Sequence, residues 1–221
     1  MSKKATARQS YETSETTRLH IMDTAEALFL EHGIDAVSDR AILREAGQRN
    51  LSALKYHFDG RDGLLTALQE RRGEQVEARR QEILATLNAL GGTISLRGAC
   101  DVLLSTYFSL CREDESFRRF LAKFGQYSMI HGNSLLIVEP ITSSLEQIFQ
   151  IIVDQLPAMD LSLLLMRLEN ANAMGILALT RRAQSDKAFH GKDADLFVEN
   201  LLDQLVAMIS APISPKTQRL I

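Results

Sequence analysis

The stretch AGQRNLSALKYHF, residues 46–58, decides how this chain folds and what it can contact. Polar and basic side chains crowd around a small apolar framework of Ala46, Leu51, Leu54 and Phe58. A buried segment would not carry so many hydrogen-bonding groups, because each would need a partner away from water. A solvated loop would not need Leu54 and Phe58. The pattern therefore predicts a short helix whose apolar face packs inward and whose polar face meets a partner.

Helical signals continue outward on both sides of this stretch. Gly33 is a natural stop for the helix before it, and Ser38 is an N-cap for a short helix that ends at Gly47. Two short helices joined by a glycine turn fit a helix-turn-helix, whose second helix enters the major groove of DNA. The helices expected in this part of the chain cover about 16–32, 38–46, 51–57 and 61–87.

The charge of the motif supports a nucleic-acid partner. From Arg40 to Phe58 there are four basic residues (Arg40, Arg44, Arg49 and Lys55) and one acid (Glu45), a local charge of +3 in a chain whose net charge is -3. We expect Leu51 and Leu54 to face inward. Arg49 would then read guanine and Asn50 adenine, and the side chains expected to project outward are Arg49, Asn50, Ser52, Lys55 and Tyr56.

The sequence resembles the TetR family of bacterial transcriptional regulators from about Arg18 to Leu65. The resemblance is carried by RLHIMDTAEALFLEHG, then Ser38, Ile42, Ala46-Gly47, YHF and GRDGLL, at spacings that agree across three helices. It implies an all-α homodimer with an N-terminal DNA-binding domain and a C-terminal domain that binds a small effector. It also implies DNA contacts from the start of the second helix, the recognition helix and a phosphate-binding position, which here are Ser38, Arg40, Leu51, Ser52, Lys55, Tyr56, His57 and Arg61.

Two departures from the family pattern affect base readout. The segment from Ala46-Gly47 to Phe58 is one residue longer than usual, which enlarges the turn Gln48-Arg49-Asn50, and Lys55 stands where a tyrosine is usual. The alternative reading is a helical ligand-binding or dimeric interaction protein whose DNA-binding head is vestigial. Lys55 is the best argument for that alternative.

The rest of the chain also reads as helix, with only 4 Pro and no convincing alternating strand pattern. Lys3, Lys4 and Arg8 lie in a segment that predicts a disordered basic tail over 1–14. Gly91 and Gly92 are the expected domain boundary. The expected domains are 15–62 for DNA binding, 63–90 as a connecting helix and 91–221 for effector binding and dimerisation, with helices near 95–111, 115–130, 134–155, 160–182 and 193–211.

Two surfaces are expected in the C-terminal domain. An apolar effector pocket is predicted to use flexible methionines beside aromatic rings, with Asn170 as polar anchor; its expected lining is Tyr107, Phe108, Phe117, Phe120, Phe124, Tyr127, Met129, Met166, Asn170 and Met174. The helices 160–182 and 193–211 carry broad apolar surface, which fits either a dimer interface or the protomer's own core. The expected interface residues are Ala173, Gly175, Val198, Leu201, Leu205 and Met208.

Other function classes find little support. The sequence has no Gly-x-Ser-x-Gly, phosphate-binding Gly-Lys-Ser/Thr or Gly-x-Gly-x-x-Gly motif, so we expect no enzyme, catalytic residue or cofactor. The five His are scattered, which predicts no metal site. No secretory leader or bilayer-spanning stretch is expected, so the predicted location is cytoplasmic. Cys100 and Cys111 are expected as buried thiols, and the run ERRGEQVEARR, 70–80, as an exposed helix face with ion pairs four residues apart.

Overall fold

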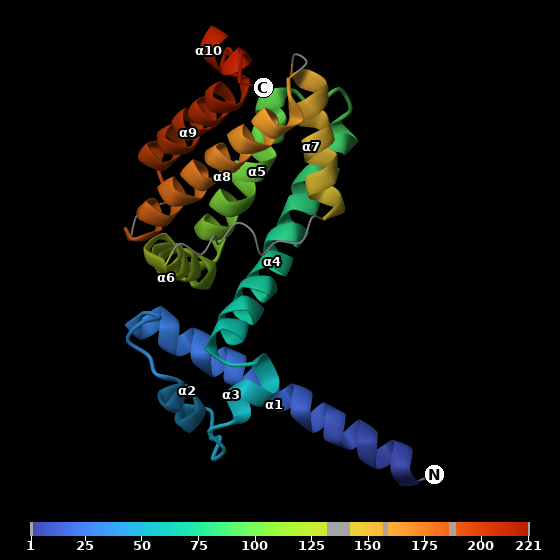
Figure 1. Ribbon diagram of the computed structural model, residues 1–221, viewed down its shortest axis with the longest axis vertical. Coiled ribbons are helices and arrows are strands. Elements are labelled where there is room, and N and C mark those ends of the chain that lie inside the picture. Colours follow the sequence, from blue (N-terminus) through green and yellow to red (C-terminus); the bar gives the residue numbers. More distant parts are fainter. Residues whose placement is uncertain (1, 132–141, 157–158, 186–188, 221) are drawn as a thin grey trace. The chain divides into compact units, whose positions relative to one another are not determined.

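The computed structural model describes residues 2–131, 142–156, 159–185 and 189–220, with side chains from residue 14 and, in the first range, up to Tyr127. Within these ranges the secondary structure is helical, with no strand. This agrees with the expected all-α class. The chain forms two compact units, 1–72 and 73–221, and helix α4 (Arg61–Leu90) continues from the first into the second (Figure 1).

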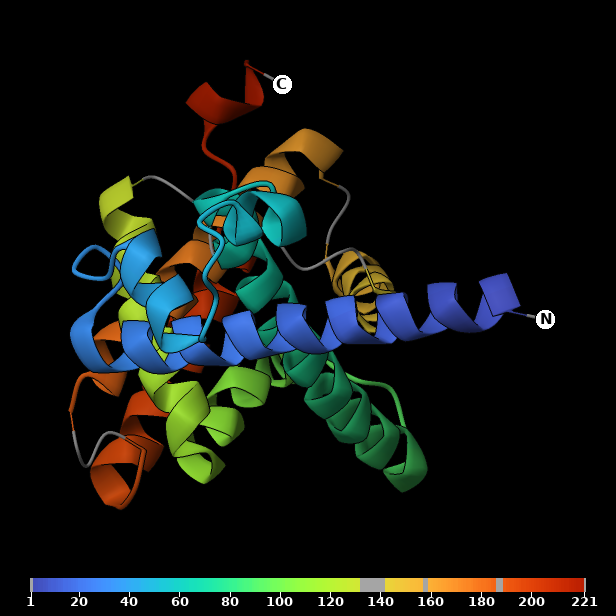
Figure 2. The same cartoon turned by 90° about the horizontal axis from the view of Figure 1, so that it is seen from below.

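The first unit contains α1 (Ser2–His32), α2 (Asp39–Glu45), α3 (Ala53–Phe58) and the start of α4. Figures 1 and 2 show α2 and α3 beside the C-terminal half of α1. The sequence predicts a disordered tail over 1–14. In the structure, α1 begins at Ser2, so this segment is helical from residue 2 onward. The core of this unit is apolar and fully buried, and includes Ile21, Ala25, Phe29, Ile42, Leu64 and Leu68.

The helix ends of the first unit form where the sequence places their signals. Gly33 has a φ of +92° and donates its amide to the Phe29 carbonyl at 2.9 Å, which closes α1. Gly47 has a φ of +66°, and the next amide, that of Gln48, bonds to Leu43 at 2.8 Å. Both glycines hold left-handed backbone that L side chains seldom adopt, so the predicted C-caps are confirmed.

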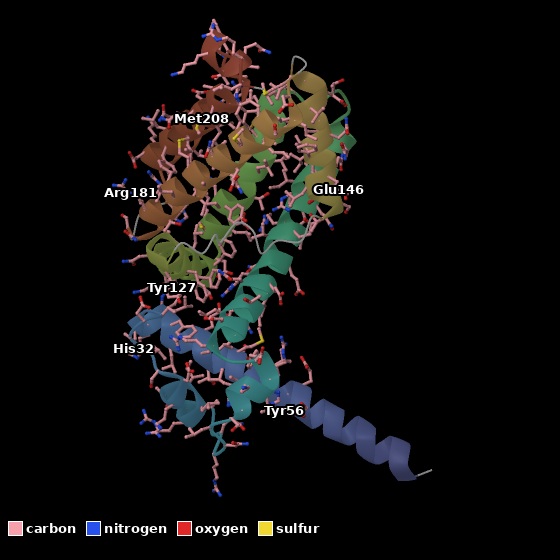
Figure 3. All side chains as sticks on the ribbon, in the orientation of Figure 1. His32, Tyr56, Tyr127, Glu146, Arg181 and Met208 are labelled. Carbon is pink, nitrogen blue, oxygen red and sulfur yellow. The ribbon has the colours of Figure 1, made fainter. Side chains whose placement is uncertain are left out.

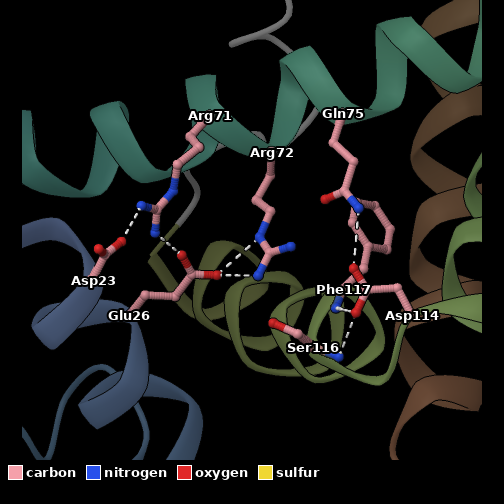
Figure 4. Close-up of polar contacts among 8 residues, drawn as sticks. All are labelled: Asp23, Glu26, Arg71, Arg72, Gln75, Asp114, Ser116 and Phe117. Atoms are coloured by element: carbon pink, nitrogen blue, oxygen red, sulfur yellow. Dashed lines mark hydrogen bonds and ion pairs between the residues drawn. The ribbon is translucent and has the colours of Figure 1, made fainter. Parts of the chain in front are cut away.

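A buried ion cluster fastens α4 to α1 inside the first unit. The Glu26 carboxylate is 5% exposed and accepts from Arg71 and Arg72, while Arg71 also donates to Asp23 at 2.6 Å (Figure 4). The expectation of an exposed helix face over 70–80 is therefore wrong for these arginines. Their partners lie 45 to 48 residues away in the sequence, where no local spacing could indicate them.

The second unit holds the rest of α4 together with α5 (Leu96–Glu113), α6 (Glu115–His131), α7 (Ser143–Gln155), α8 (Leu161–Ala183), α9 (Lys192–Ser210) and α10 (Pro215–Gln218). Helix α8 packs between α6 and α9, and α5 packs on α6, α7 and α9. Its apolar core spans these helices and takes in Val76 and Leu84 of α4. The N-terminal part of the helix expected over 134–155 falls on 134–141, outside the described residues.

The division between the units falls at Arg72, within α4, and not at Gly91-Gly92. The two glycines, with φ of +74° and +100°, follow the end of α4 and are a helix stop. Residues 73–90 pack with the C-terminal helices instead. Arg80 is buried beside Ser144 of α7. Gln75 donates to Asp114 at 3.0 Å (Figure 4). No helix in the described part of the chain is long and apolar enough to cross a membrane.

Candidate functional site

Helix α2 presents a capped, basic and exposed face. The Ser38 hydroxyl accepts from the Ala41 amide at 3.2 Å, so it holds the first turn of the helix as its N-cap. Ile42 and Leu43 are buried, while Arg40 and Arg44 are exposed. The two arginines lie four residues apart and therefore project from one side of α2.

Helix α3 divides its side chains between core and surface. Ala53, Leu54 and Phe58 are buried. Lys55 and Tyr56 of α3 are exposed, and so are Leu51 and Ser52 immediately before the helix. Leu51 is 57% exposed, so the expectation that it faces inward is wrong. It precedes the first helical residue, where the helical period that places Leu54 in the core does not apply.

The enlarged turn is ordered by Asn50. Its side-chain oxygen accepts from the Ser52 amide at 2.9 Å, and its carbonyl accepts from the Ala53 amide at 3.1 Å. This is an Asx turn, which starts α3 from a side chain. The expectation for Asn50 is base contact alone; its hydrogen bonds in the turn were not predicted, although asparagine is a common turn residue because its side chain can bond the backbone two residues on. Arg49 is exposed at the turn.

His57 is half-buried at the back of α3. Burial, and then the nearby charge of Arg18, lower the pKa of His57 below its ordinary value, with Glu15 opposing the shift. The imidazole is therefore neutral at pH 7 and adds no charge to the basic face. Its ring meets the Tyr56 ring edge to face, with centroids 4.8 Å apart. Tyr56 itself is 78% exposed; Figure 3 labels it on α3.

Arg61, which the resemblance assigns to a phosphate, is engaged inside the unit. It donates to the Asp39 carboxylate at 2.8 Å and to the Ile34 carbonyl, and its guanidinium lies 5.2 Å from the centroid of the Phe29 ring. The contacts join the start of α4 to the start of α2. Arg61 thus has the geometry of a clamp between two helices of the motif.

Gly63 allows α4 to begin directly against α3. A Cβ at this position would lie 1.6 Å from the Phe58 carbonyl oxygen, so every other residue would clash with backbone. The glycine in GRDGLL is therefore required by a close approach.

A cavity opens between α5, α8 and α9 of the second unit. It holds about 440 Å³ of space free of protein atoms, part of it open to solvent. None of the described residues that line it is acidic or basic, and its hydrogen-bonding groups come from Tyr107 and Asn172. The lining is Cys100, Leu103, Leu104, Tyr107, Leu168, Ala171, Asn172, Gly175, Ile176, Leu179, Leu205 and Ile209.

Tyr107 is shared between the predicted pocket and this cavity. Asn170, the predicted anchor, is exposed and off the lining, because two residues along a helix turn a side chain by about 200° from Asn172. The side chain of Met129 lies outside the described residues. The other predicted residues also lie off this lining: Phe108, Phe117, Phe120 and Phe124 are buried elsewhere in the unit, Tyr127 and Met174 are half-buried, and Met166 is exposed.

Three of the six residues predicted for the dimer interface belong to the protomer's own core. Leu201 and Leu205 are buried, and Gly175 lies beneath Leu205. The apolar stripe of α9 was read correctly as a stripe, but α5 and α8 of the same chain cover it. Val198 and Met208 are half-buried at its margin, and Ala173 is exposed.

The cysteines have unreactive surroundings. Burial raises the pKa of Cys100, in the cavity wall, to about 11 and that of Cys111 well above its ordinary range, so both thiols are protonated at pH 7. Within the described ranges, no three His, Cys, Asp or Glu side chains gather as they would to hold a metal.

Residues 21–68 match the model of a family described as bacterial regulatory proteins, tetR family. Ten chains of solved structures match, and no curated protein does. NalD, the secondary repressor of the MexAB-OprM multidrug efflux pump in Pseudomonas aeruginosa, is 23% identical, covers 91% of this chain and 100% of its own, and has a TM-score of 0.55.

Two further solved structures are similar over most of their length. RolR in complex with resorcinol is 18% identical over 92% of this chain and 98% of its own, with a TM-score of 0.53. A TetR-family regulator from Rhodococcus sp. is 16% identical over 86% of this chain and 99% of its own, with a TM-score of 0.55. At such identities these likenesses establish the fold alone.

Proposed function

Since the chain belongs to the TetR family of bacterial regulatory proteins, we propose that it is a repressor released by a small, uncharged, hydrophobic effector. It would bind a near-palindromic operator as a homodimer. The observation that carries the proposal is the exposed basic face of α2, the turn and α3. This face lies within the segment that matches the family and is held by caps, a clamp and a close helix contact.

The basic face has the parts that DNA recognition needs. Arg40, Arg44, Arg49 and Lys55 are exposed and supply charge for phosphates, and Glu45 is the exposed acid among them. A recognition helix of six residues reaches few base pairs. Two copies would therefore read half-sites about 34–36 Å apart, or a multiple of that distance.

A gel-shift titration of the full chain against the DNA upstream of its own gene tests the proposal. Arg49→Ala and Lys55→Ala are expected to weaken binding, and Glu45→Gln, in the same segment, should not weaken it. If the wild-type chain binds this DNA no better than a shuffled duplex of equal length, the alternative of a vestigial head is favoured.

The cavity lining indicates the class of effector. An ionised ligand would lose its hydration in an apolar wall without gaining a counter-charge, which costs several kcal/mol. A neutral ligand would instead bury apolar surface and bond to the Asn172 amide or the Tyr107 hydroxyl.

Three probes of similar size separate these cases by calorimetry. Benzyl alcohol should bind at least tenfold more tightly than benzoate or benzylamine at pH 7. Asn172→Ala should lower the affinity for benzyl alcohol about three- to tenfold, which is the effect of one lost hydrogen bond. Asn170→Ala is the matched control on the same helix, because its side chain lies off the lining. Equal affinity for all three probes would refute the uncharged-effector proposal.

We propose that α4 carries the response. It belongs to both units, holding Glu26 through Arg71 and Arg72 in one and contributing Val76 and Leu84 to the core that borders the cavity in the other. A ligand changes operator affinity only by binding two arrangements of the dimer unequally. A compound that fills the cavity and leaves operator affinity unchanged would be an occupant and not the effector.

The dimer would use the outward faces of α8 and α9, in place of the covered stripe. Exposed positions on α8 recur at helical steps and are Met166, Asn170, Ala173, Leu177 and Arg181. The matching exposed positions on α9 are Leu196, Asn200, Asp203 and Ala207. The large apolar side chains among them would otherwise stand in water.

A further inference from the structure

The recognition face of this chain contains an apolar feature that phosphate binding does not use. Leu51 is 57% exposed in the turn before α3, and the exposed residues near it in the sequence, Arg49, Asn50, Ser52 and Lys55, are polar or charged. An apolar side chain in water gains free energy when another apolar group covers it. In a DNA groove the apolar group on a base edge is the C5-methyl of thymine.

The placement of Leu51 is fixed and not an accident of a loose loop. The Asn50 side chain accepts from the Ser52 amide at 2.9 Å, and the Tyr56 amide bonds to the Ser52 carbonyl at 2.9 Å, so the residues on either side of Leu51 are held. Leu51 lies in the turn two residues before the first residue of α3, and the exposed side chains that follow it are Ser52, Lys55 and Tyr56. The core leucine of the helix, Leu54, points the other way and is buried.

Resting on the proposed function, we propose that Leu51 selects thymine by covering its C5-methyl group in each half-site of the operator. Charge complementarity names DNA as the occupant of this face. Exposed Arg49 and Lys55 stand two residues before and four residues after Leu51, and no acidic residue lies between Arg49 and Phe58. Phosphate contacts from these cations fix register, and the leucine then adds sequence preference.

Deoxyuridine provides a direct test, because it differs from thymidine only by lacking that methyl group. The probe is the duplex that the full-length wild-type protein selects from a random pool, with its thymidines replaced one at a time. Wild type is expected to lose about three- to tenfold in affinity at one position of each half-site, the effect of one or two lost methyl-sized contacts. Leu51→Ala should bind the parent duplex correspondingly less tightly and be indifferent to the same replacement.

A matched control is Leu90→Ala. Leu90 belongs to the second unit, and its side chain is 79% exposed. It should keep wild-type affinity and wild-type sensitivity to deoxyuridine. The inference is overturned if wild type binds the selected duplex specifically yet tolerates every replacement, or if Leu51→Ala remains as sensitive as wild type. Unchanged DNA affinity of Leu51→Ala would also overturn it.

Failure of the proposed function has a different signature. In that case the wild-type chain enriches no sequence from the pool and binds all duplexes alike.

Circular dichroism of Leu51→Ala is expected to match that of wild type, because the substituted side chain lies on the surface.

Discussion

The Arg61 guanidinium donates to the Asp39 carboxylate at 2.8 Å, which ties the first residue of α4 to the first residue of α2. The same guanidinium bonds to the Ile34 carbonyl and stacks on Phe29. The residue that the family resemblance assigns to a phosphate is thus placed to orient the helix-turn-helix from within.

Arg61→Ala is expected to lower the free energy of unfolding by about 1 kcal/mol, because it removes a half-exposed ion pair and a ring contact. Operator binding should weaken while its salt dependence stays the same. Asp39→Asn should also weaken operator binding. When it is combined with Arg61→Ala, it should lower the affinity little further. A salt slope reduced by about one in Arg61→Ala, with Asp39→Asn neutral, would assign Arg61 to a phosphate instead.

Gly63→Ala is expected to destabilise the first unit by about 3 kcal/mol or more, because its Cβ would meet the Phe58 carbonyl oxygen at 1.6 Å. Gly98→Ala is the matched control. Its Cβ would meet no backbone, only the Ile94 methyl at 3.1 Å and the Ser95 hydroxyl oxygen at 3.5 Å, and alanine favours helix. Thermal unfolding followed by circular dichroism distinguishes them, and equal melting temperatures would contradict the close contact of α3 with α4.

Glu26→Gln is expected to cost about 3 kcal/mol, because it leaves Arg71 and Arg72 without the buried carboxylate that they share. Glu31→Gln, on the exposed surface of the same helix, should change stability by less than about 0.5 kcal/mol. Urea unfolding of both variants checks this. A small loss in Glu26→Gln would mean that the cluster does not hold α4 to α1.

The stability of the second unit should depend on pH through Glu77. Burial alone would raise the pKa of Glu77, but hydrogen bonds from Ser144, Thr142 and Gln81, with Arg80 beside them, hold it below its ordinary value of 4.5. A carboxyl whose folded pKa is depressed contributes stability above its unfolded pKa and loses it as pH falls through the folded pKa.

The difference in unfolding free energy between wild type and Glu77→Gln should therefore be constant above about pH 5 and shrink as the pH falls below 4.5. Urea titrations from pH 3 to 7 measure it. Glu146→Gln, at an exposed carboxyl on α7, is the control variant. A difference that stays constant to pH 3 would contradict the role of Glu77.

Charge substitutions on α8 and α9 should separate the dimer face from the core. Met166→Glu with Leu177→Glu is expected to give a folded monomer, because both side chains are exposed in the protomer. Leu205→Glu should unfold the second unit, since it would bury an unpaired carboxylate at a cost of several kcal/mol. Light scattering measures the oligomeric state and circular dichroism measures folding. An intact dimer of the Met166→Glu, Leu177→Glu variant would place the interface elsewhere.

Local signals in the sequence determined the helical class and the helix-turn-helix. Gly33, Ser38 and Gly47 act on backbone within a few residues, so their roles as stops and caps can be read without any knowledge of distant contacts. The match of residues 21–68 to the family model agrees with this reading.

Tertiary structure alone decided which side chains remain available to a partner. Arg61 pairs with Asp39, 22 residues away in the sequence, and Arg71 pairs with Glu26, 45 residues away. At such sequence separations the helical period does not indicate which side chains will meet. The stripe of Leu201 and Leu205 is plain in the sequence, but a helical period shows only that something covers a face and not which surface does. Packing of the same chain covers that stripe and leaves Leu51, Met166 and Leu177 in water.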